Sequence, residues 1–133
     1  MTEFPLSITL VYLGLNALIM LALGVIVSVA RLKTRIDLGD GGNATLLQAI
    51  RAHGNNSEYV PIALIMLAAL ELMAGPPWLL HGLGGALTLG RLLHAQGLYQ
   101  SSGRSFGRVL GTSLTWLVLA AGGGACLYLG LTL

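Results

Sequence analysis

Charge is what this chain has least of. Only 9% of its 133 residues are charged, whereas 55% are apolar and the mean hydropathy is +0.80. Soluble domains carry about 25% charged residues, so the composition excludes an ordinary soluble domain. The length suits one domain over residues 1–133, which we expect the bilayer to stabilise in place of a large private core.

Cysteine is almost absent as well. The single Cys126 excludes an internal disulfide and a cysteine metal cluster, and we interpret it as a packing residue. His81 has no other candidate ligands near it in the predicted arrangement, so we expect no metal site. Basic residues are missing from Met1 to Pro5, which argues against a secretory signal. A phosphate-binding glycine loop is excluded too, because Leu87 stands where the run that begins at Gly82 needs its third glycine.

Long apolar runs are what the chain does have, and they predict four membrane spans. A span needs about 20 mainly apolar residues. We place the spans at about residues 6–30, 59–73, 78–93 and 109–131. The predicted fold is therefore all-α, an integral membrane four-helix bundle. Asn43 is a typical N-cap, so the second helix should begin near Ala44 and extend beyond the bilayer on that side.

The basic residues gather on one side of this predicted bundle. All seven lie between the first two spans or around the junction of the last two: Arg31, Lys33, Arg35, Arg51, Arg91, Arg104 and Arg108. The positive-inside rule therefore puts both basic loops in the cytoplasm and both termini outside. Trp78 and Tyr128 then fall near the outer interface, where amphipathic rings are favoured. The net charge is only +2, and we expect no nucleic-acid partner.

Polar residues cluster at the mouth of the second helix. Arg51, Asn55 and Glu58 are spaced i, i+4 and i+7, so a helix places them on one face. On composition alone, a solvated helix end explains them about as well as a binding site does. Glu58 favours the binding site, because a carboxylate so close to hydrocarbon is costly unless it has a partner.

A second polar set lies near the junction of the third and fourth helices: Arg91, His94, Arg104 and Arg108. Membrane orientation and anionic lipid explain such arginines in general, but not why two arginine groups and a carboxylate gather at one depth. Arginine forks grip carboxylates and Glu58 can accept an ammonium, so together the sets suit a small anionic ligand with carboxylates and one amine. If the ligand carried a thiol, a nearby guanidinium would favour the reactive thiolate.

Two motifs resemble a known family. RAHGNNSEYVP, residues 51–61, resembles the second-helix signature of the MAPEG family (membrane-associated proteins in eicosanoid and glutathione metabolism). RLLHAQGLYQSSGRSFGR, residues 91–108, resembles the family's region between the third and fourth helices, and the bacterial members are the most similar. The resemblance implies a homotrimer in a bacterial inner membrane, surrounded by lipid, with glutathione as co-substrate held between neighbouring subunits.

The resemblance also implies roles for individual residues. Glutathione would be held by Arg51, Asn55 and Glu58 with Tyr59 beside them, by Arg91, His94 and Arg104 from another subunit, and by Arg31 at the end of the first helix. Arg108 would stabilise the thiolate, with Arg104 as its rival. The chain departs from the family pattern at Leu98, where many members have a tyrosine, although Tyr99 is adjacent.

The implied function is that of a membrane-embedded transferase or peroxidase, in which the glutathione thiolate attacks a lipophilic electrophile that arrives from the bilayer. The alternative is a non-catalytic family member that binds lipid or a partner, and Leu98 favours it. A small multidrug transporter is a weaker alternative. Such a protein would be expected to carry a carboxylate in its first span, and residues 4–30 contain none.

Overall fold

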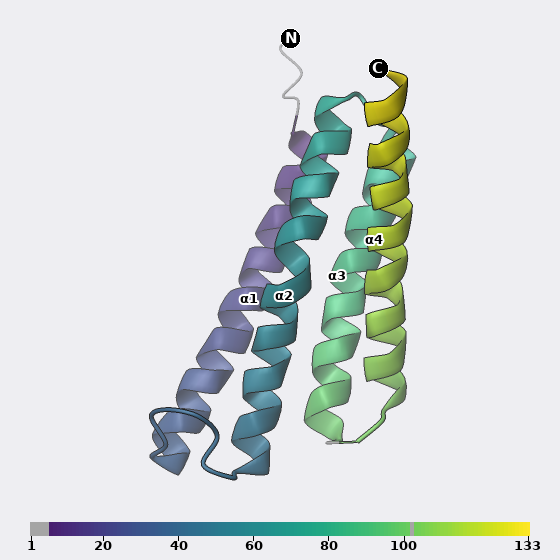
Figure 1. Cartoon of the computed structure of the whole chain (residues 1–133). Helices are drawn as coiled ribbons and strands as arrows, with labels where there is room; N and C mark the ends of the chain where they lie inside the picture. The colour runs from purple at the N-terminus through teal and green to yellow at the C-terminus, as the bar shows by residue number, and fades with distance from the viewer. Residues whose placement is uncertain (1–5, 102) are drawn as a thin grey trace.

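Four long helices make up the computed structural model, which describes residues 6–101 and 103–133. In chain order they are α1 (Ser7–Thr34), α2 (Ala44–Leu72), α3 (Pro77–Gln100) and α4 (Phe106–Thr132). The pairs α1–α2 and α3–α4 are antiparallel hairpins that pack side by side (Figure 1). The described residues contain no strand, so the predicted all-α four-helix bundle is confirmed. The segment Met1–Pro5, used above to argue against a secretory signal, lies outside the described residues.

The helix starts follow from the local sequence. The Asn43 side chain accepts a hydrogen bond of 2.9 Å from the Leu46 amide, which confirms the predicted N-cap of α2. Pro77 opens α3 in the first turn, where its missing N–H costs nothing. Ser105 caps α4 by accepting from the Arg108 amide at 3.3 Å. This cap places Arg108 in the first turn of α4, at the same end of the bundle as the start of α2.

The outer surface of the bundle is apolar. Within the described residues, α1 and α4 are the two helices long and apolar enough to cross a membrane. Large side chains on both face outward, with Leu18 65% exposed and Leu117 61% exposed. A surface of this kind suits a bilayer, whereas soluble proteins rarely expose large apolar patches. The helices α2 and α3 combine shorter apolar stretches with polar residues toward one end, and their spans remain a prediction from sequence.

Two apolar clusters fill the core. The larger joins α2, α3 and α4 toward the end where the termini lie, through residues such as Leu67, Leu87 and Val118. The smaller joins α1, α2 and α3 closer to the other end and consists of Leu23, Ala52, Ala95 and Leu98. The polar residues of α2 and α3 are placed beside this smaller cluster.

Polar contacts anchor α1 near its N-terminal end. The Glu71 carboxylate of α2 accepts hydrogen bonds from the amides of Ile8 at 2.8 Å and Thr9 at 2.7 Å. It thereby caps the first turn of α1, where free N–H groups and the helix dipole favour a negative charge. Farther along, Asn16 Nδ2 donates to Thr88 Oγ1 of α3 at 3.0 Å. Helix α1 is therefore tied to both α2 and α3 in its first half.

Candidate functional site

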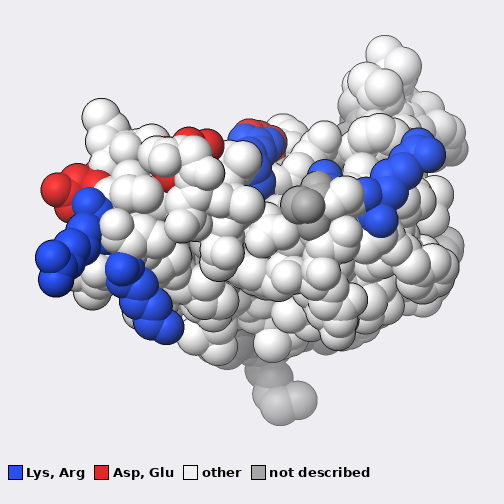
Figure 2. Space-filling view, turned by 90° about the horizontal axis from the view of Figure 1, so that it is seen from below, with Lys and Arg blue, Asp and Glu red and all other residues white. Residues whose placement is uncertain are grey.

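Basic side chains are spread over the end of the molecule that carries the connections 35–43 and 101–105 (Figure 2). The opposite end has none, because the sequence contains no lysine or arginine before residue 31, from 52 to 90 or after residue 108. This charge asymmetry is the one from which the orientation in the membrane was predicted. The candidate site lies toward the basic end.

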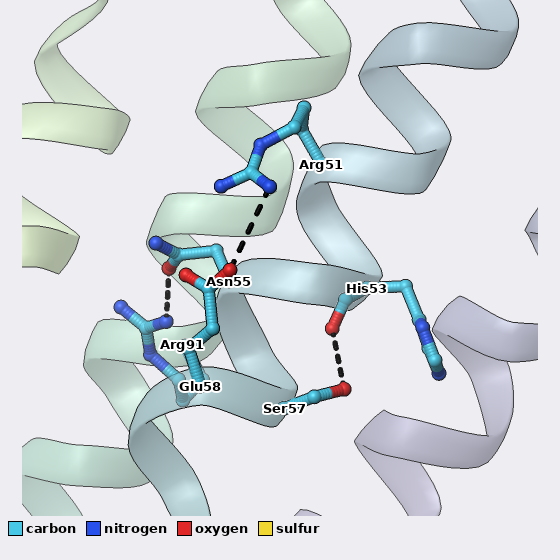
Figure 3. Close-up of polar contacts among 6 residues, drawn as sticks. All are labelled: Arg51, His53, Asn55, Ser57, Glu58 and Arg91. Carbon is cyan, nitrogen blue, oxygen red and sulfur yellow. Dashed lines mark hydrogen bonds and ion pairs between the residues drawn. The ribbon is translucent and has the colours of Figure 1, made fainter. Parts of the chain in front are cut away.

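Arg51, Asn55 and Glu58 of α2 lie on one face, as the spacing predicted (Figure 3). Arg51 Nη1 and Glu58 Oε1 form an ion pair at 3.6 Å, and both side chains are about half exposed. His53 points away from this face toward α1, where its ring lies near Gly24. The helix therefore separates one polar face, with Arg51, Asn55 and Glu58, from a face that packs against α1.

Arg91 of α3 is a buried arginine at the centre of the site, in contact with α2 and α4. Its side chain is 2% exposed. Nη1 donates to Asn55 Oδ1 of α2 at 2.6 Å (Figure 3), and Nη2 donates to Thr115 Oγ1 of α4 at 2.8 Å. The guanidinium also lies over the Tyr59 ring, with its central carbon 5.7 Å from the ring centroid. One arginine thus connects three helices.

These partners of Arg91 are all neutral. Among residues 6–101 and 103–133, no carboxylate forms an ion pair with its guanidinium, and its Nε has no hydrogen-bond partner. A buried cation is costly unless it is paired and fully hydrogen-bonded. The side chain is therefore positioned by Asn55 and Thr115, and its positive charge is left without an ion-pair partner among the described residues.

A groove of about 200 Å³ opens next to this arginine. Its lining comes from α2, α3 and α4: Ala44, Leu47, Gln48, Arg51, Asn55, His94, Leu98 and Arg108. A second groove of about 320 Å³ shares His94 and Arg108 with the first and adds Arg104 and Trp116. Polar and apolar residues line both grooves, and α4 contributes most of the lining of the second.

The groove is positively charged through its arginines and not through His94. That residue lies just beyond the predicted third span. Burial, followed by the positive charges of Arg91, Arg108 and Arg51, lowers the pKa of His94 to about 4. At neutral pH the imidazole is therefore uncharged, and it can donate one hydrogen bond and accept another.

Close packing of α3 on α4 fixes the distance from Arg91 to Thr115. A Cβ on Gly111 would lie 2.5 Å from the Gly90 carbonyl oxygen and 2.6 Å from the His94 amide nitrogen. Both are backbone atoms and cannot move aside, so the helices approach this closely only because residue 111 is glycine. Small residues allow the same close approach of helices in lipid.

The predicted site residues lie in several places. Arg51, Asn55, His94 and Arg108 line the first groove, and Arg91 is bonded to its wall through Asn55. Arg104 lines the second groove, and Glu58 reaches the site through its ion pair with Arg51. Arg31 is elsewhere: its Nη1 donates to the carbonyl oxygens of Ile36 and Gly39 in the α1–α2 connection. Tyr59 lies under Arg91 and accepts a hydrogen bond from Trp116 Nε1 at 3.2 Å.

The two polar sets meet within one chain. The resemblance implies that Arg91, His94 and Arg104 complete the pocket from another subunit, whereas here Arg91 contacts Asn55 of its own chain. His94 likewise lines the groove together with Arg51 of the same chain. A single chain therefore assembles both sets, and its grooves are open on their outer sides.

Leu98 and Tyr99 face different parts of the molecule. Leu98, at which the sequence departs from the pattern that it resembles, lines the first groove. Tyr99 instead lines two apolar hollows beside α1. Consecutive helical residues point about 100° apart. The Tyr99 hydroxyl therefore does not reach the place in the first groove that a tyrosine at position 98 would fill.

Thr115 is a site residue that the sequence reasoning missed. It is fully buried, accepts from Arg91 and donates to the Gly111 carbonyl oxygen at 2.8 Å. Its position seven residues after Arg108 puts it on the same face of α4. That spacing, together with the need of a buried arginine for acceptors, is the signal that could have identified it.

Comparisons with known proteins agree with this architecture. The sequence profile of the MAPEG family matches residues 9–128. Inner membrane protein YecN of Escherichia coli strain K12 is 36% identical over 112 residues, which cover 84% of each chain. The protein of the same name from Escherichia coli O6:H1 strain CFT073 matches to the same extent. No solved structure matches the chain.

Proposed function

The chain belongs to the MAPEG family, and from this premise we propose that it is a glutathione-dependent transferase or peroxidase of the bacterial inner membrane. The observation that carries the proposal is the buried Arg91 guanidinium, which Asn55 and Thr115 hold without neutralising it. It lies beside a groove that Arg51 and Arg108 also line. Such a site favours a small molecule with more than one negative charge.

Glutathione has the matching groups, namely two carboxylates, one ammonium and one thiol. Arg51 offers a planar fork for a carboxylate, and the buried charge of Arg91 attracts the ligand from behind Asn55. Glu58 offers an acceptor for the ammonium. The Arg51–Glu58 pair is long at 3.6 Å and half exposed, so it contributes little and can open to admit the ligand. His94, uncharged at neutral pH, supplies a further hydrogen bond.

The reaction needs no nucleophile from the protein. In transfer, the thiolate sulfur forms a bond to an electrophilic carbon, and the electron pair leaves with a displaced group or is protonated after addition. In peroxide reduction, sulfur attacks the hydroperoxide oxygen and the O–O bond breaks. A second glutathione then completes the balance of one alcohol, one water and one glutathione disulfide. Arg108 stabilises the thiolate in both cases, because a neighbouring cation lowers a thiol pKa.

The two grooves suit a division between co-substrate and electrophile. Each adjoins His94 and Arg108, so the thiol of glutathione in the first groove would face a lipophilic molecule in the second. The first groove alone, at about 200 Å³, is smaller than the about 300–1,000 Å³ of ordinary ligand sites. We therefore propose that a neighbouring subunit of a homotrimer covers the open side and completes the pocket.

Calorimetry on the detergent-purified protein tests the binding step. Arg51→Ala should weaken glutathione binding at least tenfold, because a hydrogen bond to a charged group contributes about 1.5–3 kcal/mol. Arg35→Ala is the matched control, since it removes the same charge from an exposed residue that lines neither groove. Equal affinities in the wild type and both variants would rule out this site for glutathione.

Turnover assays test the chemical step separately. Arg108→Ala should still bind glutathione but lose conjugation of a model electrophile and reduction of a lipid hydroperoxide. Arg104→Ala should retain more activity, since Arg104 lines only the second groove. Undiminished turnover in both variants would contradict an arginine-stabilised thiolate.

One observation favours a second candidate function, that of a non-catalytic family member. Leu98 puts an apolar side chain into the first groove, and Tyr99 faces elsewhere. A protein of this kind would bind an anionic ligand or lipid without chemistry. Glutathione binding that Arg51→Ala abolishes, together with no turnover of electrophiles or hydroperoxides, would support this candidate.

A further inference from the structure

Two further hollows lie on a different face of α3 from the grooves that His94 and Arg108 line. They adjoin each other, have volumes of about 340 and 460 Å³, and share Ile26 of α1 and Tyr99 of α3. We call the two together the α1–α3 groove. Each volume falls within the about 300–1,000 Å³ range of small-molecule sites. The α1–α3 groove shares no lining residue with the two grooves beside His94 and Arg108, which we call the arginine site, so a role for it is independent of the proposed function.

The walls of the α1–α3 groove are apolar stripes at helical spacing. Ile19, Ile26 and Val29 lie on the α1 side. In the hollow near mid-bundle the facing wall is Leu92, Ala95 and Tyr99 of α3. In the hollow at the basic end it is Tyr99 together with Leu46 and Ala49 of α2. Near Thr88, where Asn16 bonds across to α3, the two helices are held together. From that point they diverge toward the basic end (Figure 1). The groove is therefore closed at mid-bundle and opens toward the basic end.

The open end carries the polar groups. Lys33 and Thr45 line it, whereas no aspartate or glutamate among the described residues lines either hollow. From Ile19 to Lys33 there are 14 steps along α1, or ~21 Å at ~1.5 Å per residue. One leaflet of a bilayer contributes ~15 Å of hydrocarbon, half of the ~30 Å core. The apolar walls are thus as deep as one leaflet, and the lysine lies at headgroup level.

We propose that the α1–α3 groove binds an anionic phospholipid from the leaflet at the basic end. Its phosphate contacts Lys33 and the Thr45 hydroxyl, and one acyl chain lies between α1 and α3. The apolar walls would hold the chain of any phospholipid of similar length. The charge of Lys33, with no carboxylate beside it in the described lining, selects a headgroup with net negative charge.

Lipid exchange on the purified full-length protein tests the headgroup. Phosphatidylglycerol and phosphatidylcholine with identical chains are added to the detergent-solubilised protein, and retained lipid is measured by native mass spectrometry alongside the melting temperature. The wild type should retain phosphatidylglycerol preferentially and melt several degrees higher with it. Lys33→Gln should lose about fivefold in affinity, the contribution of one basic residue near a membrane surface. Arg35→Gln, whose side chain lines neither hollow, should not.

A bulky side chain in the groove tests whether the acyl chain of the lipid lies there. Ala22 is exposed and lines the α1–α3 groove, so Ala22→Phe should fold and reduce retention of both lipids. Ala17→Phe is the control on an exposed residue outside the lining. Unchanged retention in both Lys33→Gln and Ala22→Phe would overturn the proposal. A second outcome would also overturn it. If Ile26→Cys in a Cys126→Ser background forms disulfides efficiently between copies in the membrane, a second protein chain covers the groove.

Discussion

Thr115 determines, at the scale of the single residue, how Arg91 is held. Thr115→Val keeps the shape of the side chain but removes the acceptor for Arg91 Nη2. Hydrogen bonds to charged groups contribute about 1.5–3 kcal/mol, and an orphaned buried donor adds a further cost. We expect a lower melting temperature and about tenfold weaker glutathione binding, measured by calorimetry in detergent. Thr115→Ser keeps the hydroxyl and should retain most of the melting temperature and of the glutathione affinity. Wild-type glutathione binding by Thr115→Val would contradict the role of Thr115 in holding Arg91.

Tyr99 allows a test of which side of α3 carries the chemistry. Its ring lines the α1–α3 groove and not the groove with Arg51 and His94. Tyr99→Phe should therefore leave glutathione affinity and turnover within about twofold of wild type, since a surface change away from the site is worth about 0.5 kcal/mol or less. A large loss of glutathione affinity would mean that α3 is rotated in the assembled protein relative to this structure.

Helical spacing explains which residue contacts could be predicted. The stripe of Arg51, Asn55 and Glu58 belongs to one helix, so its face follows from the sequence alone. The pairing of Arg91 with Thr115 does not, because it depends on the rotation and distance of α4 relative to α3. For the same reason the sequence could not determine that Arg31 would bond to the α1–α2 connection.

At the scale of the helix pair, Gly111 holds α3 and α4 at the distance the site needs. Gly111→Ala would bring a methyl group against the Gly90 carbonyl and the His94 amide. We expect the helices to separate, with a loss of melting temperature and of glutathione binding together. Gly123→Ala on the same helix has open space around its Cβ and serves as the control. Gly111→Ala with wild-type binding would show that the site tolerates a wider helix pair.

The starts of helices could be predicted because their signals are local, but their anchors could not. Asn43 caps α2 through an amide three residues away. The N-terminal turn of α1, in contrast, is capped by Glu71, which lies 63 residues from Ile8 in the sequence. No local pattern around residues 6–9 points to that carboxylate. Such a pairing becomes visible only when α2 is packed against α1.

For the whole molecule, the distribution of charge predicts its orientation in the membrane. All seven lysines and arginines lie toward the end with the two longer connections, and we expect this end to face the cytoplasm. In a Cys126→Ser background, Asp37→Cys should be protected from a membrane-impermeant thiol reagent in intact cells. Ala74→Cys, in the turn at the opposite end, should react. The reverse pattern would invert the topology and put the arginine site outside.

The neutral partners of Arg91, Asn55 and Thr115, have a practical consequence for binding measurements. A cation that is fixed in place without a carboxylate counter-ion in the described chain resembles the fixed charge of an anion-exchange resin. We expect its charge, together with Arg51 and Arg108, to draw chloride, phosphate and bicarbonate into the first groove, where they compete with any anionic ligand. An apparent dissociation constant measured for this protein is accordingly a joint property of the protein and its buffer, and affinities compare only at matched anion composition.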